Sequence, residues 1–287
     1  MQSLQCLLHF EPTNICNLRC PFCTTGARQN PLPKGRLAEA HFKEVIDELA
    51  DTLVLVRLDG NGEPFLNSDT FAMIDYATRK RVASAISSNL TTFKPETIHK
   101  LIDAGLDYLI ISLDGATRET YESKRVGASF DQVLANIREL VRLKQARRSR
   151  LPFIETQFIL FDDNADQVPQ ITALSRELGV DRLLIKEGRD EKLHLTREKE
   201  PRPASGNACY WLWYVLNVTW DGNLKDCCTS GLSNPFSFGN IIHKPVLEEW
   251  NNERMRGIRR LFIEKNTDTI RDLDGCKCLS CHMIPWV

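Results

Sequence analysis

The chain has 287 residues, 42% of them hydrophobic, and its 37 Lys and Arg residues nearly balance 38 Asp and Glu residues, for a formal net charge of -1. This length and apolar content suit one barrel-sized domain with a small second module. The balanced charge argues against nucleic acid or an anionic membrane as partner.

The first two thirds of the chain alternate short β-rich runs with helical patterns, which predicts βα units around a parallel sheet. Apolar residues recur at helical spacing in the intervening segments, for example Phe42, Val45 and Ile46. The predicted strands are Leu4 to Phe10, Leu53 to Leu58, Val82 to Ser87, Tyr108 to Ser112, Ile154 to Leu160 and Arg182 to Ile185.

The composition changes near residue 189. Residues 189–207 are charged and polar and contain several Pro, Ser and Gly residues, which is typical of a linker. Beyond it, Asp221-Gly222 indicates a hairpin turn, and a helical pattern extends from about Val246 to Ile263. We therefore predict a first domain over 1–190, a linker over 191–207 and a second domain over 208–287.

No apolar run approaches the roughly 20 residues that a membrane helix needs, and the N-terminus lacks a charged segment with a cleavage site. These features predict a cytoplasmic protein. In such a setting, the ten cysteines, most of them in two groups with metal-like spacing, favour reduced thiolates that hold metal over disulfides.

The first cysteine group lies just after the first predicted strand. Cys16, Cys20 and Cys23 form a compact CxxxCxxC run that supplies three thiolates. A ferredoxin-type [4Fe-4S] cluster takes four, so this run leaves one iron open to a small molecule. A structural zinc site is the alternative, but zinc sites usually pair two CxxC-like hooks locally.

This run, including Phe22 before its last cysteine, resembles the radical S-adenosylmethionine (SAM) superfamily. The resemblance implies a partial (β/α)6 TIM-type barrel whose loops at the carboxyl ends of the strands carry the site. It implies that SAM chelates the open iron. One electron then cleaves SAM to a 5'-deoxyadenosyl radical, which abstracts hydrogen from the substrate.

A second segment strengthens the resemblance. Gly60-Asn61-Gly62-Glu63-Pro64 follows the second strand and is similar to the GGEP motif of the family, with Asn61 between the glycines. In the family this segment binds the methionyl ammonium of SAM, and Glu63 would place negative charge beside it. Taken alone, the segment would be an ordinary turn at a strand end.

Three further segments match the family less closely, and two strand residues are additional candidates. Asn89 stands where relatives carry Asn-Gly, although Leu90 replaces the glycine here. Ser112 begins a Ser-Leu-Asp-Gly segment that faces the SAM ribose or substrate in relatives. Arg125 resembles an arginine directed towards the SAM carboxylate. Gln157 and Lys186 alternate with apolar neighbours and are candidates to point inward. Capping or sheet-edge hydrogen bonds are the structural alternative for all five.

The second cysteine group comprises Cys209 and Cys227, separated by the hairpin signal, and the C-terminal pair Cys278 and Cys281. This group resembles the SPASM module in its abbreviated twitch form, as in 2-deoxy-scyllo-inosamine dehydrogenase-type enzymes. The resemblance implies that four thiolates hold an auxiliary [4Fe-4S] cluster, with zinc as the alternative. Cys228 or Cys276 are alternatives to a neighbour as ligand, and Cys276 is also a candidate hydrogen donor. The predicted ligands are Cys209, Cys227, Cys278 and Cys281.

A radical beside an auxiliary cluster suggests dehydrogenation, in which the substrate loses hydrogen and a proton and passes an electron to that cluster. We expect a small hydroxylated or amino-bearing substrate and an electron donor of the flavodoxin or ferredoxin type. Candidate catalytic residues are Ser112, Gln157, Lys186 and Cys276. Crosslinking or epimerisation of a ribosomal peptide, or epimerisation of an antibiotic-type small molecule, is the alternative reaction. An iron-sulfur electron carrier or a zinc-stabilised scaffold is the alternative class, and the GxGEP segment argues against it.

Overall fold

Strands from both ends of the chain share one sheet. The computed structural model describes residues 6–187, 211–225, 237–242 and 244–264. Within them the sheet has the order β6-β5-β4-β3-β2-β1-β7-β8, parallel except for β8, which is antiparallel to β7. The strands are β1 Leu7–Phe10, β2 Leu55–Arg57, β3 Ala83–Ser88, β4 Tyr108–Ser112, β5 Phe153–Leu160, β6 Arg182–Glu187, β7 Val215–Val218 and β8 Leu224–Lys225.

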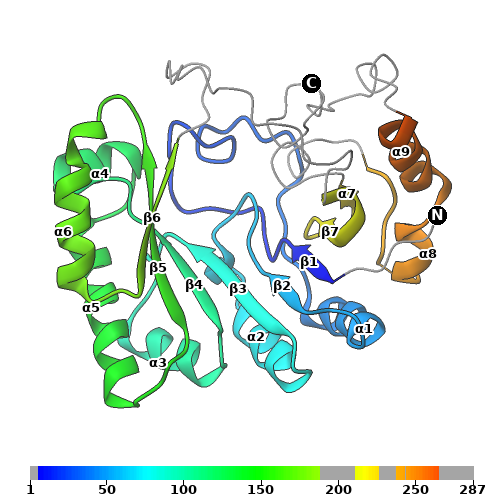
Figure 1. Cartoon of the computed structure of the whole chain (residues 1–287), viewed down its shortest axis with the longest axis horizontal. Coiled ribbons are helices and arrows are strands. Elements are labelled where there is room, and N and C mark those ends of the chain that lie inside the picture. Colours follow the sequence, from blue (N-terminus) through cyan, green and yellow to red (C-terminus); the bar gives the residue numbers. More distant parts are fainter. Residues whose placement is uncertain (1–5, 188–210, 226–236, 243, 265–287) are drawn as a thin grey trace.

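Helices connect successive parallel strands and cover one face of the sheet (Figure 1). In α5 the Ser129 hydroxyl caps the first turn by accepting from Gln132 N, and the Gly179 backbone, at φ 72°, ends α6 in the left-handed region. The helices are α1 Glu39–Leu49, α2 Thr70–Arg79, α3 Pro95–Asp103, α4 Arg118–Lys124, α5 Phe130–Ala146, α6 Val168–Leu178, α7 Trp211–Tyr214, α8 Val246–Trp250 and α9 Glu253–Glu264, with short 3-10 turns η1 Pro64–Leu66 and η2 Ala165–Gln167.

The core lies between the sheet and these helices. On β1, Leu8 and Phe10 are buried on the helix side, where Phe10 packs against Phe42 of α1 with ring centroids 6.3 Å apart. Because side chains alternate along a strand, the residue between them, His9, faces the opposite, concave side of the sheet. That concave side is where the polar candidates can gather.

The predicted α/β architecture, a partial barrel followed by a smaller module with a hairpin and helix, is confirmed. All six predicted barrel strands are present, with ends that shift by up to three residues, the largest shift being at the start of β1, which begins at Leu7 rather than Leu4. Gly222, at φ 82°, occupies the predicted hairpin turn between β7 and β8. The predicted linker 191–207 lies outside the described residues.

One predicted helix is wrong. The pattern from Val246 to Ile263 forms two helices, α8 and α9, rather than one. The break falls at Asn251 and Asn252, where the Asn252 side chain accepts from Met255 N (2.9 Å) and so begins a new helix. Asparagine side chains compete with the helix backbone for hydrogen bonds, and the spacing of apolar residues does not reveal a helix break caused in this way.

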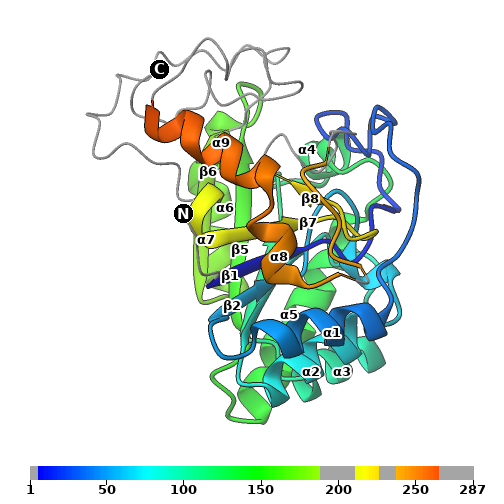
Figure 2. The ribbon, with the colours of Figure 1, turned by 90° about the vertical axis from the view of Figure 1, so that its right-hand side faces the viewer.

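The C-terminal elements pack directly on the barrel. Strand β7 pairs with β1, and α8 lies against α1 (Figure 2). Glu48 of α1 accepts hydrogen bonds from the backbone N–H groups of Val246 and Leu247, at 2.8 and 3.0 Å, and so caps the first turn of α8. The first third of the chain therefore helps to place the last third.

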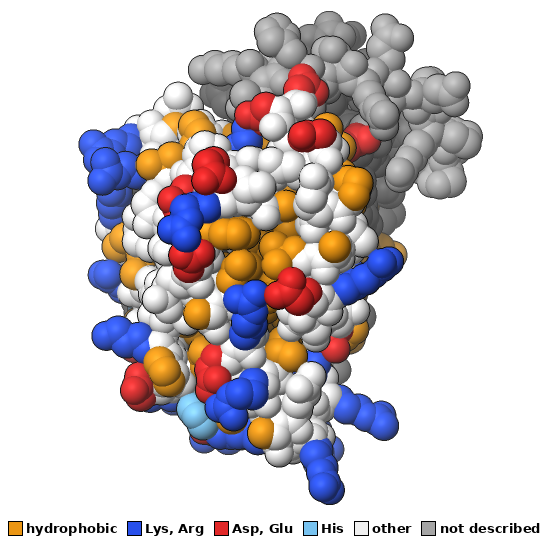
Figure 3. Space-filling model, turned by 90° about the vertical axis from the view of Figure 1, so that its left-hand side faces the viewer, with side chains coloured by type: hydrophobic (Ala, Val, Ile, Leu, Met, Phe, Trp, Pro, Cys, Tyr) orange, Lys and Arg blue, Asp and Glu red, His pale blue; other side chains and the backbone are white. Residues whose placement is uncertain are grey.

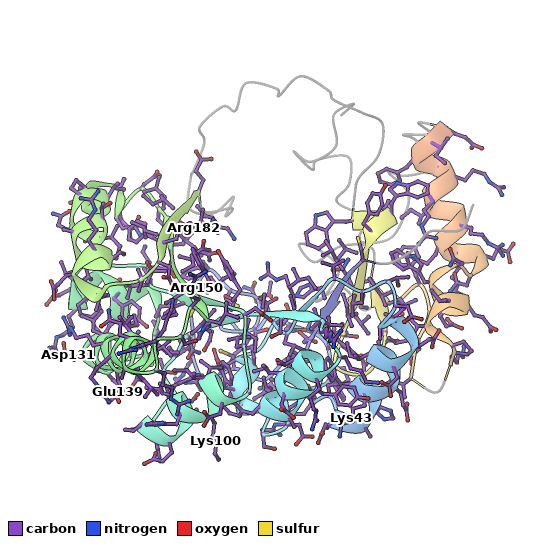
Figure 4. All side chains as sticks on the ribbon, turned by 60° about the horizontal axis from the view of Figure 1, so that its bottom comes forward. Lys43, Lys100, Asp131, Glu139, Arg150 and Arg182 are labelled. Carbon is purple, nitrogen blue, oxygen red and sulfur yellow. The ribbon has the colours of Figure 1, made fainter. Side chains whose placement is uncertain are left out.

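Charges of both signs are spread over the outer surface. Figure 3 shows basic and acidic side chains interspersed with apolar ones on the side of α4, α5 and α6, where Arg138 pairs with Glu177 at 2.9 Å. In Figure 4, Lys43, Lys100 and Asp131 lie on the outer side of the helices. Among the described residues, no helix has the length and apolarity needed to cross a bilayer.

Candidate functional site

The cysteine run forms a tight loop after β1, in the dark-blue segment that lies between β6 and β1 in the view of Figure 1. Cys23 N donates to Cys20 O (3.2 Å), and Ala27 N donates to Cys23 O (2.7 Å). A Cβ on Gly26 would lie 2.5 Å from Cys20 N, so this closure requires glycine. Cys20 is a buried free thiol, while Cys16 and Cys23 are half-buried free thiols.

The three thiols of this loop act on one another electrostatically. The charges of Cys20 and Cys23 both act on Cys16, so the three lie within electrostatic reach of one another. Yet the described residues contain no group of three or more His, Cys, Asp or Glu side chains that could hold one metal ion. A cubane places its thiolates on separate irons, which sets them further apart than ligands of one ion. Three thiolates from one loop are the type of donor that iron-sulfur clusters use.

Two of these thiols resist ionisation in the metal-free protein. Burial raises the pKa of Cys16 to about 11, and the charge of Glu63 adds to the effect. Burial also raises the pKa of Cys20, against the opposing influence of Arg125. Because thiols bind metal as thiolates, cluster binding must release protons from this loop.

The GxGEP segment lies against the backbone that precedes Cys16. Glu63 N donates to Ile15 O (2.9 Å). A Cβ on Gly62 would lie only 2.3 Å from Thr13 O. The second glycine therefore permits a backbone contact that any larger residue would block.

The Glu63 carboxylate is directed into the protein. It is buried and accepts hydrogen bonds from the Ser88 hydroxyl (2.7 Å) and from Asn89 N (2.8 Å) at the end of β3. Burial raises the pKa of Glu63 to about 7, although these two hydrogen bonds oppose the shift. Glu63 thus joins the GxGEP segment to the Asn89 segment.

The next contact returns to the cysteine loop. Asn89 Nδ2 donates to Asn17 Oδ1 (3.1 Å), between the first two cysteines. Leu90, which replaces the glycine of relatives, has φ 57° and is fully buried. Glycine adopts this left-handed backbone without strain, whereas a residue with a Cβ does so at a cost.

A buried ion pair supports the same loop from the other side of the barrel. Asp114, fully buried after β4, accepts from Arg125 Nε (2.5 Å) and from Ile159 N (2.7 Å). The Arg125 guanidinium also lies 3.9 Å from Cys20 Sγ and 5.2 Å from the centre of the Phe22 ring. Arg125 therefore places a positive charge beside a predicted cluster ligand.

Three candidate side chains lie on neighbouring strands. Ser112 of β4 is paired in register with Gln157 of β5, and Lys186 of β6 is paired with Ile159, two residues beyond Gln157. All three alternate with residues that face the helices, so they share the concave face. Ser112 is buried, Gln157 is half-buried and Lys186 is exposed. The remaining predicted site residues lie outside the described part of the chain: Cys209, Cys227, Cys228, Cys276, Cys278 and Cys281.

The structure adds a polar network that the motifs did not indicate. His9 Nε2 lies 2.7 Å from Asp59 Oδ1, and His9 Nδ1 lies 3.3 Å from Asn217 Oδ1 of β7. Asp59 Oδ2 also accepts from Arg57 and from Ser87 N. His9 and Asp59 are both buried. The available sequence signal was a histidine flanked by two apolar residues on a strand, which alternation places on the concave face.

Sequence reasoning also missed Glu11. This fully buried residue follows β1, and its Oε1 accepts from Asn61 N at 2.8 Å. A Cβ on Gly60 would lie 2.7 Å from the same side chain, which accounts for the first glycine of the motif. The sequence signal that could have indicated Glu11 is its position as an acidic residue at the carboxyl end of a predicted strand.

Comparison with known proteins identifies the family. Residues 10–157, more than half of the chain, match the model of the radical SAM superfamily. The chain belongs to the radical SAM superfamily. Residues 209–282 match the iron-sulfur cluster-binding domain named SPASM. The predicted cofactors, SAM with a [4Fe-4S] cluster and an auxiliary iron-sulfur centre, are therefore confirmed at the level of these domains.

Relatives within the radical SAM superfamily differ in activity. The chain is 31% identical to the AdoMet-dependent heme synthase of Methanosarcina barkeri over 174 residues, which is 60% of this chain and 48% of that protein. It is also 31% identical to the mycofactocin maturase MftC of Mycolicibacterium smegmatis over 175 residues, which is 60% of this chain and 42% of that protein. The chain thus spans less than half the length of these relatives.

The fold extends to almost the whole of one solved structure. BtrN in complex with AdoMet and 2-DOIA superposes with a TM-score of 0.59 over 97% of this chain and 94% of that chain, at 16% identity. At this identity the likeness concerns the fold alone. It shows that the barrel and the described C-terminal elements share the fold of that structure.

Proposed function

We propose that Cys16, Cys20 and Cys23 hold the SAM-binding [4Fe-4S] cluster, with SAM bound between the GxGEP segment, Asn89, Ser112 and Arg125. The observation that carries this proposal is a set of direct contacts: segments after β2, β3 and β4 all reach the cysteine loop. They do so through Glu63 to Ile15, Asn89 to Asn17 and Arg125 to Cys20.

The residues of the chain have distinct roles in this proposal. When bound, the cluster and SAM supply a carbon-centred radical that removes hydrogen from a substrate carbon, and the auxiliary cluster supplies an electron acceptor. Arg125 offsets the negative charge of the thiolates, and Asp114 holds its guanidinium in place. Glu63 fixes the distance between two segments that surround SAM, through its bonds to Ser88 and Asn89.

The proposed reaction is dehydrogenation of a small hydroxylated or amino-bearing molecule. Ser112, Gln157 and Lys186 lie on the concave face and offer hydroxyl, amide and ammonium groups suited to polar substituents. The proposed auxiliary ligands are Cys209, Cys227, Cys278 and Cys281. Among known folds, the arrangement of BtrN, whose structure contains 2-DOIA, also accommodates a small molecule. We further propose a cytoplasmic setting and a flavodoxin- or ferredoxin-type electron donor.

Replacing the three cysteines tests the cluster assignment. The Cys16→Ala, Cys20→Ala, Cys23→Ala variant, reconstituted with iron and sulfide under anaerobic conditions, should form no 5'-deoxyadenosine from SAM with dithionite, yet retain the auxiliary cluster. Cys6→Ala is the matched control, because Cys6 is also a free thiol but makes only a long contact, 3.9 Å, to Tyr214 O. SAM cleavage by the triple variant would contradict the assignment.

The mass of the product separates the candidate reactions. Dehydrogenation of a small molecule yields a product lighter by two hydrogen atoms. Crosslinking within a peptide also removes two hydrogen atoms, so the substrate that is consumed separates these two reactions. An unchanged mass with solvent deuterium gained at one carbon would identify an epimerase instead.

Peptide modification is the second candidate function, supported by the match to the maturase MftC. It predicts that the reconstituted protein consumes a precursor peptide and converts it to a crosslinked or epimerised form. Incubation with small polyols, aminocyclitols and peptides encoded near the gene, read by mass spectrometry, distinguishes the two substrate classes.

A further inference from the structure

Glu11 connects the proposed SAM-binding loop to the C-terminal module. Its two carboxylate oxygens accept from different segments: Oε1 from Asn61 N at 2.8 Å, and Oε2 from Trp220 N at 3.4 Å. Asn61 belongs to the GxGEP segment, and Trp220 lies in the turn of the β7–β8 hairpin. One fully buried carboxylate therefore spans two parts of the chain that lie far apart in sequence.

Trp220 makes a second contact through its ring, with Gly35, which follows the cysteine run. A Cβ on Gly35 would lie 2.2 Å from the Trp220 ring, so the indole packs directly on this glycine. Gly35 is in turn held to the residues before Cys16, because Thr13 Oγ1 donates to Gly35 O (2.6 Å) and Gly35 N donates to Asn14 Oδ1 (2.9 Å). The hairpin thus contacts the chain on both sides of the cysteine run.

Burial removes the Glu11 carboxyl group from water and raises its pKa. The backbone N–H groups of Asn61 and Trp220 compensate part of the lost hydration, and the Asn61 side chain also acts on this group. If the hairpin moves, Glu11 loses the Trp220 donor, and its hold on Asn61 changes with it. A buried acceptor shared in this way makes the positions of the two segments interdependent.

We propose that Glu11 is a positioning residue that couples the hairpin of the SPASM module to the SAM-binding loop, so that displacing the hairpin weakens SAM binding. This inference rests on the proposed function for its ligand. Coupling of this kind is reciprocal, so SAM binding should also stabilise the hairpin. Glu11, just after the carboxyl end of β1, would thereby couple the position of the hairpin to the position of the SAM-binding loop.

The test uses Glu11→Gln. A glutamine amide has one acceptor oxygen and an NH2 group that only donates, so it can satisfy only one of the two N–H groups. We expect the Kd for SAM, measured by calorimetry on reconstituted protein, to rise about tenfold, which corresponds to about 1.4 kcal/mol. In the metal-free protein, hydrogen exchange at the Asn61 amide should become faster.

Glu155→Gln is the matched control. Glu155 is an equally buried carboxylate on β5, but it binds Tyr108 and Arg182 away from the cysteine loop. Its replacement should lower stability while leaving the SAM Kd and the exchange of Asn61 unchanged. A purely structural role for Glu11 would make the two variants behave alike.

A second perturbation acts from the hairpin alone. Gly35→Ala places a methyl group in the space of the Trp220 ring and should raise the SAM Kd and speed Asn61 exchange, as Glu11→Gln does. Adding Trp220→Val removes the colliding ring atoms and should restore both values. The Gly35→Ala and Glu11→Gln effects should be less than additive, because both act through one contact.

The outcomes separate this inference from the proposed function. If Glu11→Gln and Gly35→Ala bind SAM as the unaltered protein does, with unchanged Asn61 exchange, the coupling is refuted. If the unaltered protein binds no SAM, the proposed function fails instead. In that case the exchange measurement on metal-free protein still decides whether Glu11 links the hairpin to the loop.

Discussion

The backbone at Leu90 provides a quantitative test of the local structure beside the site. Leu90 is fully buried and has φ 57°, so it combines a large apolar contact with a left-handed backbone. Replacing a buried leucine with alanine costs about 2–5 kcal/mol. The left-handed conformation costs a residue with a Cβ about 1–2 kcal/mol, and glycine avoids this cost.

These magnitudes predict an inverted order of stability. At an ordinary position glycine is about 0.5–1 kcal/mol less stable than alanine because of its greater freedom in the unfolded chain. At Leu90 the relief of strain outweighs that difference. Leu90→Gly should therefore be more stable than Leu90→Ala by about 0.5–1 kcal/mol, although both are less stable than the unaltered protein.

The assay is urea denaturation of the metal-free protein followed by circular dichroism. Leu109 on β4 is the control, since it is equally buried and its backbone has no positive φ. There, alanine should be more stable than glycine. If the Leu90→Gly variant is less stable than the Leu90→Ala variant by the same margin as the corresponding variants at Leu109, the inferred strain is absent.

Three further predictions concern the site. The pKa of Glu63 is about 7 in the folded protein against 4.5 for an exposed glutamate, so only the folded state retains the proton between these values. Glu63 should therefore contribute a fall of about 3 kcal/mol in the unfolding free energy of the metal-free protein as the pH rises through that window. Glu63→Gln should remove this contribution and leave that of Glu11, whose pKa burial also raises. Gly62→Ala should weaken SAM binding in calorimetry because the added Cβ would meet backbone atoms. Gly257→Ala is the control: its Cβ would meet nothing within 4 Å, and in helix α9 the change should raise the unfolding free energy by about 0.5–1 kcal/mol. Arg125→Ala should lower the unfolding free energy by about 3–5 kcal/mol, because it leaves the buried Asp114 carboxylate unpaired; a loss under 1 kcal/mol would mean that water reaches Asp114.

Local patterns predicted the barrel well. Each βα unit carries its own signals, namely a short apolar strand, a turn and an amphipathic helix, so the first six strands could be recognised one at a time. The cysteine run, the GxGEP segment and Asn89 follow three of these strands, and parallel strands bring their carboxyl ends together. Their proximity could therefore be expected from the order of elements alone.

Long-range partnerships could not be predicted in this way. The pairing of β7 with β1 joins residues some 200 positions apart, and nothing in either strand specifies the other. Glu11 and His9 each gain one of their partners through that pairing, because Trp220 and Asn217 arrive with β7. An isolated acid or histidine at a strand end does not reveal which partner will satisfy it.

Spectroscopy of the iron offers the most direct test of the central claim, that the three thiolates leave one iron of a [4Fe-4S] cluster available to SAM. The measurement is Mössbauer spectroscopy of the anaerobically reconstituted protein before and after SAM is added. We predict that SAM changes the parameters of one iron site and leaves its neighbours in the same cluster unaltered. Spectra that are identical with and without SAM would contradict the account.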